Sequence, residues 1–147
     1  MIIGRFGSTT GRPYMKGRLY LPRLGISGRV SFLVDTGADQ SMLMPADAIR
    51  LRVPYDQLRG DSEAYGIGGS VHSYVERARI MFTEPDVALH GYEIDLDIVG
   101  LDPAMIDYTS LLGRDVIDRW QMTYDPAGVG LKARVRSADF TINLRTA

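Results

Sequence analysis

Short stretches of this chain alternate between apolar and polar residues, a period of two that is typical of strands with one buried face. The clearest stretch is 92–98, where four apolar residues alternate with three acidic ones: Tyr92, Ile94, Leu96 and Ile98 with Glu93, Asp95 and Asp97. Three carboxylates close together can form a metal site, but this alternation predicts that they line the solvated face of a strand. We therefore expect no metal there.

Other apolar runs bounded by turn residues predict the remaining strands. They cover residues 14–21, 29–34, 71–82 and 140–144, together with a hairpin over 122–135 that turns at 125–128. Residues 24–28 are predicted to form the turn between the first two strands. Residues 59–70 are rich in turn-forming types, and the glycine-rich residues 66–69 within them are flanked by strand-like sequence.

Helical patterns are short and cover only residues 44–52, with Pro45 in the first turn, and residues 113–120. We expect Trp120 to pack in the core beneath the second helix. The fold class predicted by these elements is all-β, mainly strands with one or two short helices.

No repeat, linker or low-complexity tract divides the sequence. We therefore expect residues 1–147 to form a single domain, with an N-terminal extension over 1–12 and a C-terminal hairpin and tail over 126–147. A chain of 147 residues can bury one hydrophobic core.

The charge balance gives no sign of a polyanionic partner. There are 17 basic and 18 acidic residues, a net charge of −1, so we expect no general attraction to nucleic acid or to anionic membranes. Lys132, Arg134 and Arg136 alternate along a late strand, but no aromatic residues that could stack on bases lie beside them. A solvated strand face is the simpler interpretation.

Several classes of site are excluded by composition. The chain has no cysteine and only two histidines, His72 and His90, which excludes disulfides and thiolate sites and disfavours zinc. The N-terminus lacks the pattern of a signal peptide, and no apolar run approaches the roughly 20 residues of a membrane-spanning helix. We expect a cytoplasmic protein with neither metal nor cofactor, and no membrane partner.

The candidate chemistry lies where an apolar run ends in Asp35, Thr36, Gly37 and Ala38. A buried strand that ends in aspartate brings a carboxylate to the edge of the core. Gly37 permits a tight turn there, and the Thr36 hydroxyl can hydrogen-bond the backbone. Because a three-residue match arises by chance, the alternative is an ordinary aspartate that caps a turn.

Two further motifs follow at a distance. Gly66, Ile67, Gly68 and Gly69 form a glycine-rich segment of the kind that a mobile lid over an active site needs, although an ordinary tight hairpin has the same composition. Near the end of the chain, two leucines precede the sequence Gly113-Arg114-Asp115 and the predicted helix.

These three motifs, in this order and spacing, resemble the retropepsin-like family of aspartic peptidases, the retroviral type, over residues 29–124. The resemblance implies a single-lobe acid protease fold with Asp35, Thr36 and Gly37 as the catalytic triplet. It also implies an ion pair between Asp39 and Arg114 beside the site. The residues implied to contact substrate are Ala38, Asp39, Gly66, Ile67, Gly68 and Gly69.

The chemistry of this family implies a homodimer. Peptide hydrolysis by aspartates needs two carboxylates that share one proton, and this chain has one D-T-G. We therefore expect an aspartic endopeptidase in which Asp35 from two copies activates a water to cut a peptide or protein substrate. The segments flanking the resemblance predict a dimer sheet that is built differently from that of retroviral enzymes, or a weak dimer.

Two alternatives of another kind stay open. One is a non-catalytic peptide-binding or dimerisation module of the same fold, and another is a protease that acts on one partner protein only. A serine protease triad of Ser41, His72 and an aspartate can be assembled from the composition, but no motif supports it. His72 is more simply a solvated side chain.

Overall fold

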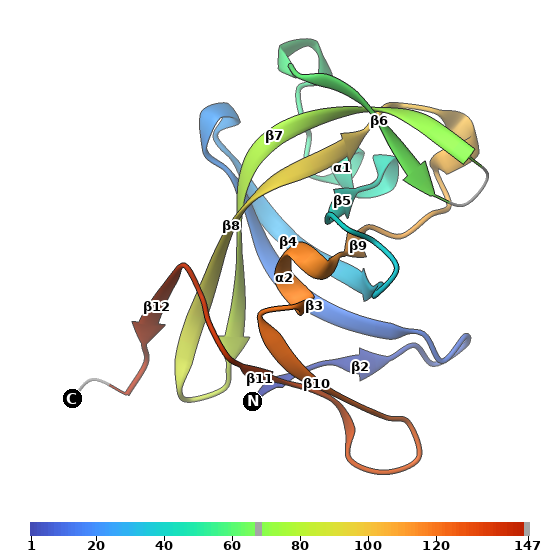
Figure 1. Cartoon of the computed structure of the whole chain (residues 1–147). Helices are drawn as coiled ribbons and strands as arrows, with labels where there is room; N and C mark the ends of the chain where they lie inside the picture. Colours follow the sequence, from blue (N-terminus) through green and yellow to red (C-terminus); the bar gives the residue numbers. More distant parts are fainter. Residues whose placement is uncertain (67–68, 146–147) are drawn as a thin grey trace.

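Strands dominate the computed structural model, which describes residues 1–66 and 69–145 (Figure 1). The strands are β1 (Ile2–Ile3), β2 (Arg5–Phe6), β3 (Pro13–Leu21), β4 (Ile26–Val34), β5 (Met42–Leu43), β6 (Asp61–Gly66), β7 (Gly69–Glu84), β8 (Ala88–Val99), β9 (Leu111–Leu112), β10 (Trp120–Asp125), β11 (Gly130–Val135) and β12 (Phe140–Asn143). The helices are α1 (Pro45–Arg50), α2 (Arg114–Ile117) and the 3₁₀ turns η1 (Pro22–Leu24), η2 (Tyr55–Gln57) and η3 (Pro103–Met105). The predicted fold class is confirmed.

The strands form two sheets. The larger has nine strands in the order β12-β8-β5-β9-β4-β3-β7-β6, with β2 added on β3 and a further pairing of β7 with β8. The smaller has the order β1-β11-β10. Most neighbours are antiparallel, but β4 pairs with β9 and β5 pairs with β8 in parallel. The short strands β5 and β9 therefore lie in the middle of the large sheet.

Aromatic side chains fill the centre of the core. Phe82, Tyr92 and Trp120 are buried and meet edge to face, with ring centroids 4.9–6.1 Å apart. The Trp120 Nε1–H donates to the Tyr92 hydroxyl at 2.7 Å, which in turn donates to the Ser137 carbonyl at 2.9 Å. The prediction that Trp120 packs in the core is confirmed, although it opens β10, because the second helix ends three residues earlier.

One strand lies within the turn-rich segment before residue 71, and another lies in the predicted N-terminal extension. Residues 61–66 form β6, because the 16-residue strand β7 offers a partner along their whole length. Ile2, in the predicted extension, is 2% exposed and pairs with Ala133 of β11. The β6 pairing is a local hairpin with β7, whereas the β1 pairing joins residues more than 100 positions apart and has no local signal.

The acidic face of β8 is only partly solvated. The side chains of Glu93 and Asp95 are 40% and 62% exposed and face Arg79 and Arg77. Asp97, in contrast, is 9% exposed, because the end of β8 lies between β7 and β5 and is covered. The prediction that Asp97 is solvated is therefore wrong. The described residues include no group of three side chains that could hold a metal.

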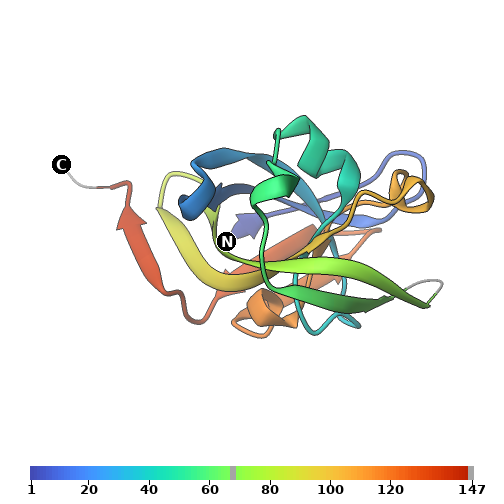
Figure 2. The same cartoon turned by 90° about the horizontal axis from the view of Figure 1, so that it is seen from above.

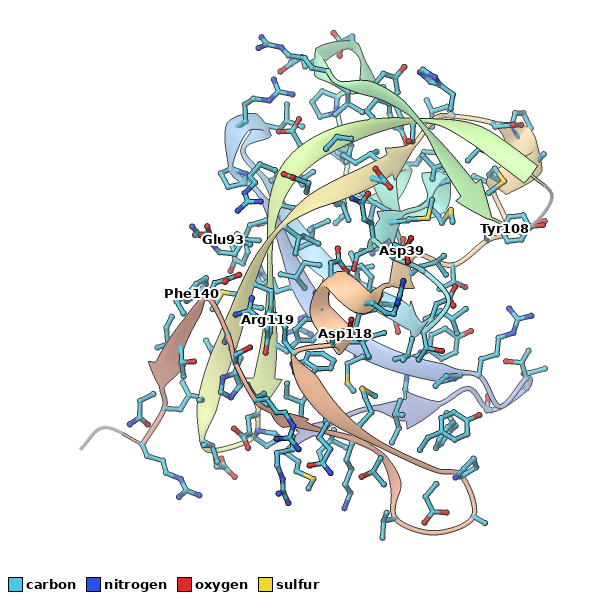
Figure 3. The ribbon with its side chains drawn as sticks, viewed as in Figure 1. Asp39, Glu93, Tyr108, Asp118, Arg119 and Phe140 are labelled. Carbon is cyan, nitrogen blue, oxygen red and sulfur yellow. The ribbon has the colours of Figure 1, made fainter. Side chains whose placement is uncertain are left out.

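The C-terminal strand β12 pairs with the start of β8, so the predicted strand near residue 140 is confirmed. Phe140 lies directly on Gly91, where any Cβ would come within 2.0 Å of its ring. Arg119 binds Asp139 at 2.9 Å and Arg79 lies over the Phe140 ring. Figures 1 and 2 show β12 at the side of the molecule opposite the tip of the β6–β7 hairpin, and Figure 3 shows Arg119 and Phe140 on the β12 side. No helix among the described residues is long and apolar enough to cross a membrane.

Candidate active site

Asp35 lies directly after β4, in the middle of the large sheet. Leu33 and Val34 pair in parallel with Leu111 and Leu112 of β9, and the Asp35 N–H donates to the Leu112 carbonyl at 3.0 Å. Because Leu112 is fully buried, this pairing fixes the end of β4 against the core. The carboxylate is half-buried at the edge of that core.

The turn after Asp35 fixes the carboxylate in place. The Gly37 N–H donates to Asp35 Oδ1 at 2.9 Å, and the Ala38 N–H donates to the Asp35 carbonyl at 3.2 Å. A Cβ on Gly37 would lie 3.2 Å from that carboxylate oxygen, a tight contact. Thr36 is exposed beside the carboxylate. One carboxylate oxygen is therefore fixed by the backbone, and the neighbouring Thr36 lies at the surface.

Gly113 and Arg114, at the start of α2, pack against the backbone of this turn. The Arg114 N–H donates to the Ala38 carbonyl at 2.8 Å. A Cβ on Gly113 would lie 2.6 Å from the Gln40 carbonyl carbon and 2.9 Å from the Ala38 carbonyl oxygen. Only glycine therefore allows the two motifs to approach this closely.

A buried polar network, which the sequence did not reveal, locks these motifs together. The Ser41 hydroxyl donates to Asp115 Oδ1 at 2.8 Å, the Ser41 N–H donates to Asp115 Oδ2 at 2.9 Å, and the Gly113 N–H donates to the Ser41 hydroxyl at 3.0 Å. Ser41 thus binds Asp115 rather than serving a serine triad. Its place six residues after Asp35 carries no sequence signal by itself.

Asp97 borders this network through its backbone, because its N–H donates to the Ser41 carbonyl at 3.2 Å. Burial, and then the negative charge of Asp115, raises the pKa of the Asp97 carboxyl above its ordinary value. The support of the active-site turn therefore contains two carboxyl groups that interact unfavourably when both are charged.

Arg114 and Asp39 form an ion pair beside the turn. Their side chains are 48% and 80% exposed in the single chain. An exposed pair of this kind contributes little to folding, because water competes for both charges. Figure 3 shows Asp39 next to α2.

Comparison with known proteins connects this geometry to a family. Residues 25–119 match the family described as gag-polyprotein putative aspartyl protease. The chain belongs to this family. The matched segment spans the Asp35 turn, the β6–β7 hairpin and α2, which are the elements of the candidate site. A comparison with curated proteins finds no match.

Two solved structures share the retropepsin-like fold of this aspartyl protease family member. One is titled EIAV protease complexed with the inhibitor HBY-793, with 21% identity, a TM-score of 0.50, and coverage of 76% of this chain and 90% of that chain. Another is a retropepsin-like aspartic protease from Rickettsia conorii, with 20% identity, a TM-score of 0.52, and coverage of 85% and 92%. At this identity the likeness shows the fold alone.

The glycine-rich segment forms the tip of the β6–β7 hairpin. Gly66 ends β6 and pairs with Gly69, which begins β7, while Ile67 and Gly68 lie outside the described residues. Val71, near the tip, packs against the same apolar cluster as Leu111, which neighbours Leu33 in the sheet. In this aspartyl protease family member, the hairpin residue Val71 and Leu111 of β9, the neighbour of the Asp35 strand, therefore pack against one apolar cluster, formed by Met42, Met44, Val99 and Met105.

His72 has no catalytic arrangement with Ser41 in the structure. Its ring meets the Tyr74 ring edge to face at 4.8 Å, on β7 beyond the hairpin tip. The loop between β8 and β9 carries Tyr108, which Figure 3 shows on the side toward which the hairpin tip points. Asp35 is the carboxylate around which the described elements converge.

Proposed function

We propose that this chain is an aspartic endopeptidase that acts as a homodimer, with Asp35 from each copy at a shared active site. The observation that carries the proposal is the Asp35 turn, in which the Gly37 N–H holds one carboxylate oxygen at 2.9 Å while Gly113 packs beneath the turn. An aspartate that only caps a turn does not need this second support from a distant glycine. Membership of the aspartyl protease family supports the same reaction.

In the proposed reaction, a water lies between Asp35 and Asp35 of the partner subunit. Two carboxylates about 3 Å apart cannot both be ionised, so the pair holds one proton. The ionised carboxylate takes a proton from the water, whose oxygen bonds to the carbonyl carbon, while the protonated one donates to the carbonyl oxygen. The tetrahedral intermediate then collapses as the C–N bond breaks and the amine nitrogen takes up a proton.

The second copy is required because the chain supplies one D-T-G. Two-fold symmetry, the commonest symmetry of oligomers, brings the same turn of two copies together. Thr36 is exposed beside Asp35, so its hydroxyl is accessible to the partner's turn. In this proposal the two Thr36 residues brace the two active-site turns against each other.

The proposed substrate is an extended peptide segment covered by the β6–β7 hairpin. Ala38, Asp39 and the glycines of the hairpin tip would contact it, and Arg114 would hold Asp39 in place. Peptides bind well beside strands, because main-chain hydrogen bonds recognise any sequence in extended form. Neither a metal nor a cofactor takes part in this reaction.

A cleavage assay on a peptide library tests the proposal. Wild-type protein should cut peptides, and Asp35→Asn should abolish cleavage while circular dichroism shows an unchanged fold. Asp56→Asn is the matched control, because Asp56 is an exposed aspartate on η2, and it should cut like the wild type. Cleavage by Asp35→Asn would contradict the proposal. If a wild-type dimer binds a statine inhibitor but cuts no peptide, the two alternatives that stand are the non-catalytic module and a protease that acts on one partner protein only.

A further inference from the structure

One outward face of the large sheet carries basic side chains that have no acidic partner. Lys16 and Arg18 lie on β3, and Arg29 lies on β4 directly opposite Arg18. All three residues are exposed. Among the residues that the structure describes, none forms an ion pair or a hydrogen bond with the side chain of Lys16, Arg18 or Arg29. The overall net charge of −1 conceals this local excess, because acidic residues elsewhere balance it.

Two carboxylates on the neighbouring strands of this face are already paired. Tyr20 of β3 lies opposite Arg79 of β7, which binds Glu93 of β8 at 2.9 Å. Arg77 of β7 binds Asp95 of β8 at 3.3 Å in the same way. These ion pairs balance the charge of the β7–β8 part of the face, so the unbalanced positive charge lies on β3 and β4.

The arrangement of Arg18 and Arg29 is unfavourable in the isolated chain. Residues directly opposite each other in antiparallel strands have Cβ atoms about 4.5–5.5 Å apart, and like charges at such positions destabilise a sheet. An anion between the two guanidinium groups replaces this repulsion by attraction and can accept charge-assisted hydrogen bonds from both. The pair therefore favours a negatively charged ligand at this position.

A groove of about 350 Å³ lies along these residues. Its lining includes the three basic side chains, and we call it the basic groove. Apolar side chains from three other strands line it as well, namely Ile3 of β1, Met81 of β7 and Leu89 of β8. A ligand that fits this lining has to combine negative charge with apolar groups.

The tyrosines of this face already have arginines over their rings. The guanidinium carbon of Arg18 lies 5.8 Å from the centre of the Tyr20 ring, and that of Arg5 lies 5.0 Å from the centre of the Tyr14 ring. Proteins that bind single-stranded nucleic acid present such rings to the bases for stacking. A lipid surface, in turn, is too flat to fill a concave groove. These features favour a peptide as the ligand.

We infer that the basic groove binds an acidic peptide segment of another protein, with a carboxylate between Arg18 and Arg29 and a second one beside Lys16. Apolar side chains of the same segment pack on the apolar part of the lining. None of the described residues that line the groove belongs to the Asp35 turn. The inference therefore goes beyond the proposed function, and binding in the groove does not require peptidase activity.

Binding of a labelled peptide tests the inference. The probe is a fluorescein-labelled peptide in which pairs of glutamates alternate with leucines, and the control probe has glutamine in place of each glutamate. The protein is the full chain with Asp35→Asn, so that no peptidase activity consumes the probe. Fluorescence anisotropy should show saturable binding of the acidic probe that weakens as the salt concentration is raised, and no binding of the glutamine probe.

Two variants locate the binding on the protein. Lys16→Gln and Arg29→Gln each remove one charge, and neither side chain has a partner within the described residues that the change would release. Each should raise the dissociation constant about fivefold, as expected for the loss of one exposed ion pair. Arg134→Gln is the matched control, because Arg134 is also exposed but lies on β11 in the small sheet, and binding should be unchanged. Arg29→Gln should melt no lower than its parent, because it removes the repulsion from Arg18.

Selective binding of the acidic probe, weakened by both groove variants but not by Arg134→Gln, supports the inference. Absence of binding, equal binding of the glutamine probe, or equal weakening by all three variants overturns it. Oligothymidylate and vesicles that contain phosphatidylserine are tested at the same salt concentration. If either binds while the acidic peptide does not, the ligand is a nucleic acid or a membrane and the inference is wrong. Cleavage is not measured, so each of these outcomes leaves the proposed peptidase function as it stands.

Discussion

Asp97 and Asp115 make the stability of the structure beneath the active-site turn depend on pH. Asp115 is fixed by two hydrogen bonds from Ser41, and burial together with the Asp115 charge raises the pKa of Asp97. The folded state therefore binds the Asp97 proton more tightly than the unfolded state does. The contribution of Asp97 to stability is fully present below the ordinary aspartate pKa and is lost as the pH rises through the raised value.

Asp97→Asn should remove the loss of folding stability that Asp97 causes as the pH rises. The amide cannot ionise, so the variant should melt a few degrees above the wild type at pH 7, and the two should converge in acid. Thermal unfolding of both proteins from pH 4 to pH 7 measures the effect. A variant that melts below the wild type at pH 7 would show that the Asp97 carboxylate stabilises the fold when charged.

Because Gly113 has no side chain, the start of α2 can pack directly against the Asp35 turn. Gly113→Ala would place a Cβ at 2.6 Å from the Gln40 backbone, so the Asp35 turn has to shift. We expect a loss of about 1–3 kcal/mol in stability, the usual cost of overpacking, and a larger fall in kcat than in substrate affinity. Urea unfolding and peptidase kinetics measure the two effects. Unchanged kcat in the folded variant would mean that the turn tolerates displacement.

Among the elements, those with a local signal were predictable and those made by distant pairing were not. The alternation of residues 92–98 and the proline at the start of α1 identify their elements directly. The N-terminal β1 depends on a partner far along the chain, so its short sequence does not reveal it. The candidate site follows the same rule, because D-T-G is visible while the Ser41–Asp115 contact joins residues 74 positions apart.

The strand β12 is expected to matter for stability but not for catalysis. Phe140→Ala removes a ring that covers Gly91 and lies beside Arg79. Because this ring is half-exposed, the cost should be about 1–2 kcal/mol, below the ~3–5 kcal/mol of a fully buried phenylalanine. Peptidase activity below the melting temperature should be unchanged, since β12 lies on the side opposite the β6–β7 hairpin tip (Figure 2). A large loss of kcat in the folded variant would contradict this separation.

At the scale of the whole molecule, one chain provides half of a site. In the proposed dimer, the Asp35 turn, the exposed Thr36 and the Asp39–Arg114 pair lie at the site that a second copy completes. The sequence predicted this need from its single D-T-G, and it also predicted either a dimer sheet built differently from that of retroviral enzymes or a weak dimer.

The most direct test mixes wild type with the Asp35→Asn variant at constant total protein, after exchange of subunits. If catalysis needs Asp35 from both copies, mixed dimers are inactive, and activity should fall as the square of the wild-type fraction. If each chain works alone, activity should fall in simple proportion to that fraction. A quadratic fall is the result we predict for the homodimeric aspartic peptidase, and a linear one would contradict it.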